Sequence, residues 1–205
     1  MELDPRTTAV VAVHYQGDIV GPDGAFAGFF HAQVVDRDVL SVTRNLLDTV
    51  RAAGVPVIYT RVAWQPDYTD LDANSPLLGI VVQSGCLKDG SPLAEIVSEV
   101  APAADDDVVT HKRVGGFTDS GLHELLQRQG VQTVVFAGVA TNASVESTAR
   151  QASDLGYRVV VVEDACSAAT LEAHQASIAS LGLLAEIATA ADVTAALTAT
   201  ASTPA

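Results

Sequence analysis

The sequence has few basic residues and no cluster of them. Eleven lysines and arginines stand against 25 acidic residues, which gives a formal net charge of -14. A charge of this sign and size repels the phosphates of nucleic acids and the headgroups of anionic lipids. We therefore expect neither a nucleic acid nor a membrane as a partner.

Apolar segments long enough to cross a bilayer are also missing. The chain begins MELDPRTTAVVAVHYQ, which lacks the basic flank and the apolar core of a secretory signal peptide. From these two absences we expect a cytoplasmic protein.

Cysteine is scarce as well. Cys86 and Cys166 lie in unrelated segments and form no CxxC or CxxH pattern, which argues against a disulfide framework and against a zinc knuckle. No two histidines have the spacing of a zinc-binding helix, and the phosphate loops GxGxxG and GxxxxGK[ST] are absent. We expect no metal and no other cofactor.

Apolar residues, by contrast, are abundant. They make up 48% of the chain while charged residues make up 18%, a balance typical of a compact globular protein. A length of 205 residues suits one domain with a continuous core. We place that domain at residues 1–200 and expect a flexible tail at 200–205, where small residues dominate.

Short runs of β-branched residues alternate with amphipathic helical stretches along most of the chain. Strands are expected at 8–13, 55–61, 107–112, 131–139, 157–164 and near 185–189. Most of these runs are apolar throughout, so both faces of the sheet should be covered by helices. The predicted fold class is α/β, a three-layer αβα sandwich around a six-stranded, mostly parallel, doubly wound sheet.

Two long segments, 17–33 and 62–91, fall outside this rhythm and are expected to be irregular functional loops. In an open parallel sheet, ligands bind beyond the carboxyl ends of the strands. The residues that leave the predicted strands are His14, Arg61, Lys112 and the turn 138–144. In that turn the free N–H groups of a helix start converge near Ser144, where they could hold an oxyanion.

Three motifs in order resemble the isochorismatase-like cysteine hydrolases. They are AVVAVHYQGDIV, DVVTHKRVGGFTDSGLHELL and GVATNASVESTARQASDLGYRVVVVEDACSAA, and the similarity extends over about residues 8–198. The resemblance implies that Ser144 stands where the family has its catalytic cysteine and His14 where it has its aspartate. It aligns Lys112 with the catalytic lysine and Phe117 with an aromatic residue of the site. It also implies oxyanion donors at Ala140 and Ser144, after a cis peptide between Val139 and Ala140.

These replacements predict a Ser/His/Lys arrangement. A serine hydroxyl must lose its proton to a base as it attacks, and His14 is the candidate base. A lysine cation nearby would keep His14 neutral near pH 7. The alternatives are that Ser144 only caps a helix and that His14 is a hydrogen-bonded structural residue.

Further candidates lie in the two long segments. Phe29, Phe30 and Trp64 could contact substrate above the strand ends, together with Phe26 and Tyr68, although the phenylalanines could equally tie the loop down. Arg61 could bind a substrate carboxylate or pair with surface acids. Nicotinamidases of this superfamily hold a metal after the second strand, but residues 60–86 contain no histidine.

Three functions remain open on the sequence alone. The first is cleavage of a C–N bond in a small amide, ureide or carbamoyl compound through Ser144. The second is a catalytically silent relative that binds a small molecule or a partner in the same cleft. The third is vinyl-ether hydrolysis of the isochorismate type, which needs no cysteine. In each case the resemblance implies a homodimer or homotetramer.

Overall fold

A computed structural model describes residues 1–201 of the chain, with side chains to residue 198. Of the tail expected at 200–205, residues 202–205 therefore lie outside the described residues. Among the described residues, none of the helices combines the length and the apolar character needed to cross a membrane.

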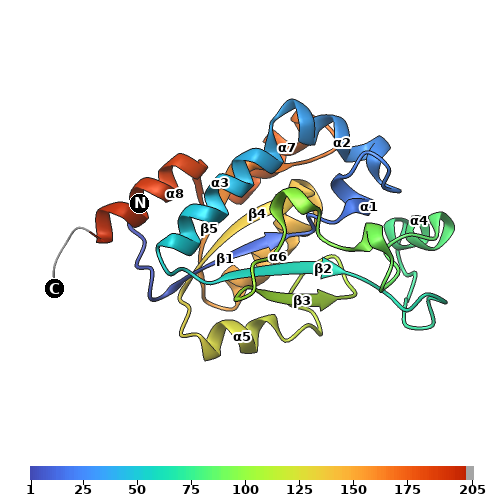
Figure 1. Cartoon of the computed structure of the whole chain (residues 1–205), viewed down its shortest axis with the longest axis horizontal. Coiled ribbons are helices and arrows are strands. Elements are labelled where there is room, and N and C mark those ends of the chain that lie inside the picture. Colours follow the sequence, from blue (N-terminus) through green and yellow to red (C-terminus); the bar gives the residue numbers. More distant parts are fainter. Residues whose placement is uncertain (202–205) are drawn as a thin grey trace.

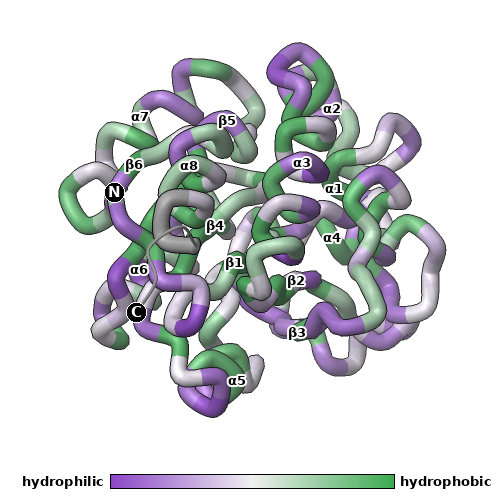
Figure 2. Tube along the Cα trace, turned by 60° about the vertical axis from the view of Figure 1, so that its left-hand side comes forward, coloured by the Kyte–Doolittle hydropathy of each residue, from purple (hydrophilic) through white to green (hydrophobic). Residues whose placement is uncertain are grey.

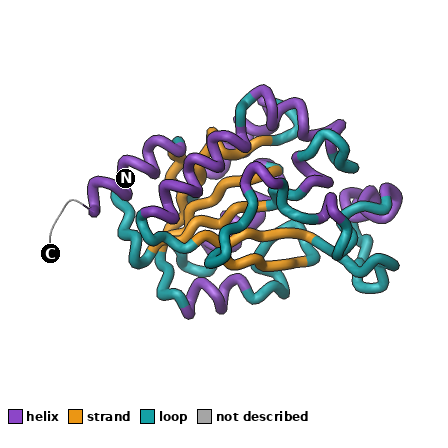
Figure 3. The backbone as a smooth tube through the Cα atoms, in the orientation of Figure 1, coloured by secondary structure: helices purple, strands orange, loops and turns teal. Residues whose placement is uncertain are grey.

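A single parallel sheet of six strands forms the centre of the molecule (Figures 1 and 3). In sheet order the strands are β3 (Asp107–His111), β2 (Val57–Val62), β1 (Thr8–Val13), β4 (Thr133–Val139), β5 (Arg158–Ser167) and β6 (Glu186–Ala188). Every neighbouring pair runs parallel. The predicted doubly wound α/β class is confirmed.

Helices cover both faces of this sheet. One face carries α2 (Ala27–Asp36), α3 (Val39–Ala52) and α8 (Ala190–Ala201), and the other carries α5 (Leu122–Arg128), α6 (Glu146–Asp154) and α7 (Leu171–Leu181). Successive residues of a strand point to opposite faces. Val10 and Ala12 accordingly pack in the first core, whereas Val11 and Val13 pack in the second.

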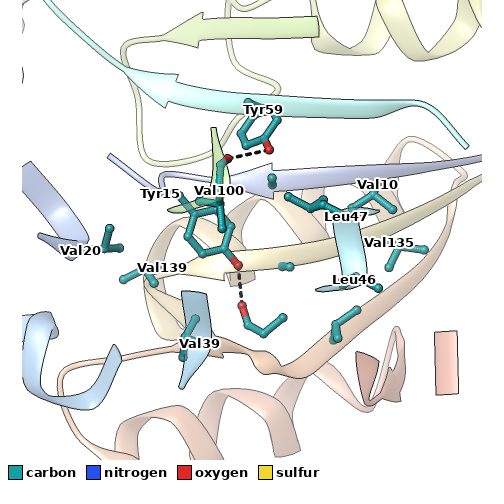
Figure 4. Packing of buried hydrophobic residues seen from close by; sticks show 14 of the residues in the cluster. Val10, Tyr15, Val20, Val39, Leu46, Leu47, Tyr59, Val100, Val135 and Val139 are labelled. Carbon is teal, nitrogen blue, oxygen red and sulfur yellow. Dashed lines mark hydrogen bonds between the residues drawn. The ribbon is translucent and has the colours of Figure 1, made fainter. Parts of the chain in front are cut away.

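The first core also contains two tyrosines whose hydroxyls are satisfied internally. Tyr15 donates to the carbonyl of Ala165, and Tyr59 donates to the carbonyl of Val100. Figure 4 shows both rings among the aliphatic side chains of this core. Figure 2 shows the same apolar character along the strands at the centre of the fold. Buried polar groups cost free energy unless they are paired, so these bonds permit the tyrosines to be buried.

The two long segments expected to be irregular contain helices. α1 (Gly17–Val20) lies within the first segment, and α2 begins in it and continues past its end. α4 (Pro76–Ser84) lies within the second segment. Ser75 caps α4 by accepting from the N–H of Leu78, and Pro76 occupies its first turn. Figure 1 shows α1 and α4 gathered beyond the arrowheads of the strands. They stand where a parallel sheet binds its ligands.

The chain leaves β1 for one half of the sheet and β4 for the other, so the winding reverses between these two adjacent strands. A crevice forms at such a reversal because the connections diverge from it. His14 follows β1 and the turn that holds Ser144 follows β4. The topology thus brings these two segments to one place.

Candidate active site

His14 leaves the end of β1 in an unusual backbone conformation. Its φ angle is 55°, a left-handed value that non-glycine residues adopt rarely and often at functional sites. Its N–H donates to the carbonyl of Thr60, which continues the pairing between β1 and β2. The side chain is buried.

Gly138 allows the end of β4 to approach the end of β1. Its φ angle is 147°, and a Cβ at this position would lie 2.2 Å from the carbonyl oxygen of Val13. Only glycine accepts this contact. The residue therefore fixes how closely the next turn sits beside His14.

The turn after β4 is a short π-helical segment, Thr141–Val145, which follows a cis peptide bond between Val139 and Ala140. The carbonyl of Ala140 accepts from the N–H groups of Ala143 and Val145. Outside the turn itself, the N–H groups of Ala140 and Ser144 find no acceptor among the described residues. Free N–H groups at a helix start can bind a negative oxygen.

His111, the last residue of β3, is the side chain that lies against His14. The two Nε2 atoms are 2.8 Å apart, and the rings are stacked with centroids 4.8 Å apart. The Nδ1 atom of His111 lies 2.9 Å from the carbonyl oxygen of Arg113. A carbonyl can only accept, so Nδ1 of His111 carries its proton. In the neutral pair, His14 then donates from Nε2 to His111, which leaves Nδ1 of His14 with a free lone pair.

Burial keeps both imidazoles neutral. Desolvation, and then the neighbouring His111, hold the pKa of His14 well below its usual value of 6.5. Desolvation also lowers the pKa of His111 to about 4, although the bond to the Arg113 carbonyl opposes the shift. Near pH 7 the pair therefore carries no charge.

His14 and Ser144 open onto one cavity of about 230 Å³, hereafter the strand-end cavity. Its walls are mostly aliphatic and aromatic and come from the ends of β1, β2 and β4 together with α1, α2 and α4. The aromatic lining residues are Phe26, Phe29, Phe30 and Trp64. The volume is below the 300–1,000 Å³ common for drug-sized ligands, so the cavity suits a small molecule.

The hydroxyl of Ser144 is not held by the protein. The residue is 8% exposed and lines the strand-end cavity, yet within the described part of the chain its hydroxyl forms no hydrogen bond to His14 or to any other group. Its carbonyl, in contrast, accepts from the hydroxyl of Thr148. The hydroxyl is therefore free to turn toward a ligand.

Some predicted site residues meet in the strand-end cavity and others do not. His14, Ser144, Ala140, Phe29, Phe30 and Trp64 all line it. Arg61 lies outside, because it donates to Asp89 and Glu95. Phe117 also lies outside and stacks on Tyr157.

The prediction that Lys112 joins His14 and Ser144 differs from the structure. Its Nζ pairs with Asp70, its side chain is 49% exposed, and it does not line the strand-end cavity. Successive strand residues face opposite ways. His111 lies on the same face of β3 as Val109, which packs on the second core. Lys112 continues the opposite face, to which the exposed Val108 belongs. A strict count of this alternation could have favoured His111.

Sequence reasoning also missed Arg113 and Asn142, which line the strand-end cavity. Gln16 was missed too: its side-chain amide bridges the backbone of Val62 and the carbonyl of Ala94, which ties the segment after β1 to the end of β2 and to a later loop. These residues lie within the three motifs, but their type alone assigns them no role, so only their place in the fold singles them out. Among the described residues, no group of three or more His, Cys, Asp or Glu side chains is arranged so that it could hold a metal ion.

Comparison with known proteins places this arrangement in a family. The model of the isochorismatase domain matches residues 8–192. The chain belongs to the isochorismatase family. It is 36% identical to the uncharacterized isochorismatase family protein YecD of Escherichia coli O157:H7, over 87% of this chain and 89% of that protein.

Other family members are similar over most of their length. The ureidoacrylate amidohydrolase RutB of Acinetobacter baylyi is 31% identical over 87% of this chain and 78% of its own. The crystal structure of a cysteine hydrolase from Pseudomonas syringae pv. phaseolicola superposes with a TM-score of 0.88 at 26% identity, covering 97% of this chain and 96% of that one. The chain is thus an isochorismatase family hydrolase, and its fold matches that of the family's structures.

Proposed function

We propose that the protein hydrolyses the C–N bond of a small amide, ureide or carbamoyl compound, with Ser144 as the attacking group and His14 as its base. The observation that carries the proposal is that both side chains line one small cavity, at the start of a helical turn where the N–H of Ala140 has no acceptor among the described residues. The similarity to proteins named ureidoacrylate amidohydrolase supports C–N cleavage over other hydrolyses.

In the first step the oxygen of Ser144 bonds to the carbonyl carbon, and its proton passes to Nδ1 of His14. The carbonyl becomes an oxyanion, for which the N–H groups of Ala140 and Ser144 are the proposed donors. His14 then gives the proton to the leaving nitrogen as the C–N bond breaks. Water releases the acyl group from Ser144 by the same steps in reverse order.

The histidine pair takes the place of a carboxylate in this scheme. When Nδ1 of His14 accepts a proton, its Nε2–H still donates to His111, so the second imidazole stabilises the positive charge. The low pKa makes His14 a weak base but a strong proton donor to the leaving nitrogen. Slow turnover with a broad pH range is the expected consequence.

A second candidate is a binding protein without catalysis. It is favoured by the absence of a hydrogen bond between Ser144 and His14, since an activated serine usually has its base within reach. Catalytic hydrogen bonds often form only when substrate is bound, so this geometry does not decide against the enzyme.

Turnover of a panel of small amides and ureides, followed by ammonia or amine release, separates the two candidates. For the enzyme, Ser144→Ala should abolish turnover and His14→Ala should lower it by about 10² to 10⁴. Ser153→Ala on α6 is the matched control and should leave turnover unchanged.

The binding-protein candidate predicts a different result. Wild type and Ser144→Ala would be equally inactive, whereas a triple variant with His14→Asp, His111→Lys and Ser144→Cys would gain activity. A thiol ionises far more readily than a hydroxyl, so this variant tests whether the cavity itself admits substrate. That outcome would leave the native protein as a binder.

A further inference from the structure

Arg113 is the one formally charged side chain among the described residues that line the strand-end cavity. No aspartate or glutamate of residues 1–198 lines it, and His14 is neutral near pH 7. The overall charge of -14 repels anions from the molecule in general, so a local cation has a marked effect on which ligand can enter. The question is what this cation binds.

The guanidinium of Arg113 lacks a good protein partner. Its Nη2 lies 3.6 Å from the carboxylate of Asp72, which is 67% exposed, and an exposed pair at this distance contributes little. Its Nη1 is buried and has no hydrogen-bond partner within the part of the chain that the structure describes. A buried N–H left unpaired costs free energy that an arriving acceptor recovers.

Two nearby cations show the contrast. Arg61 forms short pairs with Asp89 and Glu95, and Lys112 pairs with Asp70. Both side chains therefore already form ion pairs with carboxylates of the protein. Arg113 lines the strand-end cavity, is 38% exposed and has only the long pair with Asp72.

The lining holds further unpaired donors. Among the described residues, the buried indole N–H of Trp64 has no hydrogen-bond partner, and the N–H of Ala140 has no acceptor. Together with Arg113, these donors favour a ligand with several acceptor oxygens. The aromatic and aliphatic walls favour an apolar body between them.

We propose that Arg113 determines specificity by binding a carboxylate, so that the substrates are small apolar acids that carry an amide, ureide or carbamoyl group. A guanidinium binds a carboxylate through two parallel hydrogen bonds, which fixes its orientation. The carboxylate end then sits at Arg113 and the scissile carbonyl at Ser144. This substrate class rests on the proposed hydrolysis, but the binding preference can be measured without turnover.

The test uses calorimetric titration of Ser144→Ala protein, which cannot form an acyl intermediate. The ligands are N-carbamoylvaline and N-carbamoyl-β-alanine, each compared with its methyl ester. The acid should bind at least about tenfold more tightly than its ester. Adding Arg113→Gln should remove this preference while leaving the ester's affinity unchanged, and Arg113→Lys should keep part of it. Arg128→Gln on α5 removes the same charge from an exposed site and should keep the full preference.

Equal affinity for acid and ester, a preference that survives Arg113→Gln, or no binding of either acid would overturn the proposal. A preference that depends on Arg113 in a protein that never turns over these ureides would uphold it. In that case the proposed catalysis alone would fail.

Discussion

The histidine pair shows how single residues set the chemistry of the strand-end cavity. His14 and His111 come from β1 and β3, which flank β2, and meet at a distance of 2.8 Å. The chain of donors runs from His14 through His111 to the carbonyl of Arg113. In the proposed reaction His111 would therefore act through His14, whereas Lys112 is exposed and pairs with Asp70.

This difference predicts unequal effects of two neighbouring substitutions. His111→Ala should lower kcat/KM by tenfold or more, because it removes the group that orients and supports His14. Lys112→Ala should lower it far less. Steady-state kinetics on one ureide substrate measures both, and a larger loss for Lys112→Ala would show that the lysine reaches the substrate.

Protonation of His111 should couple stability to pH. Its pKa is about 4 in the folded protein and near 6.5 when unfolded, so the unfolded chain binds more protons between these values. The stabilisation is complete above pH 6.5 and is lost as the pH falls toward 4. From pH 7 to pH 5 the free energy of unfolding should fall by about 2 kcal/mol on account of this residue.

Urea unfolding of wild type and His111→Asn at the two pH values checks this expectation. The variant lacks the titrating imidazole. Its free energy of unfolding should therefore fall by about 2 kcal/mol less than that of wild type between pH 7 and pH 5. Equal losses would mean that His111 does not titrate in this range.

At the scale of elements, helix α7 holds the turn that carries Ser144. Arg37 donates to Nε2 of His174, so the proton of this imidazole is on Nδ1, which donates to the hydroxyl of Thr141. The hydroxyl of Ser177, on the same helix, lies within hydrogen-bond distance of the carbonyl of Thr141 and of the carboxylate of Glu146. The first residue of the π-helical turn is thus fixed at its side chain and at its backbone.

Thr141→Val removes the acceptor without changing the shape of the side chain. The loss of a buried hydrogen bond should cost about 1–3 kcal/mol of stability. Because the turn positions Ser144 and its N–H groups, kcat should fall more than KM rises. Thr49→Val on α3 removes a hydroxyl far from the cavity and serves as the control. If both variants lost activity equally, the contact at Thr141 would have only a structural role.

At the scale of the whole molecule, the expected association into a homodimer or homotetramer remains a prediction. Several large apolar side chains lie exposed around α2 and α4, among them Phe29, which is 52% exposed. Exposed apolar surface of this kind is costly unless it is covered. Sedimentation velocity at micromolar concentration should give a mass of at least twice the 21.2 kDa chain, and a single monomeric species would contradict it.

The fold was predictable from the sequence because its information is local. Each strand is a short β-branched run, and the structure places β1 at Thr8–Val13, as the run TAVVAV predicts. Apolar strands without alternation imply helices on both faces, and that layering follows from burial alone. The shared location of His14 and Ser144 could also be predicted, because strand ends beside the reversal of winding must meet.

Only the tertiary structure decided which neighbour of a strand end faces the cavity and which cations are free. β3 is an edge strand with alternating burial, and a shift of one residue separates the inward His111 from the outward Lys112. Arg61 finds its acids 28 and 34 positions away in the sequence, at distances that no motif encodes. The sequence determined the fold and the end of the sheet at which the site lies. Packing and ion pairs between distant segments decided its members, because those contacts exist only once the chain has folded.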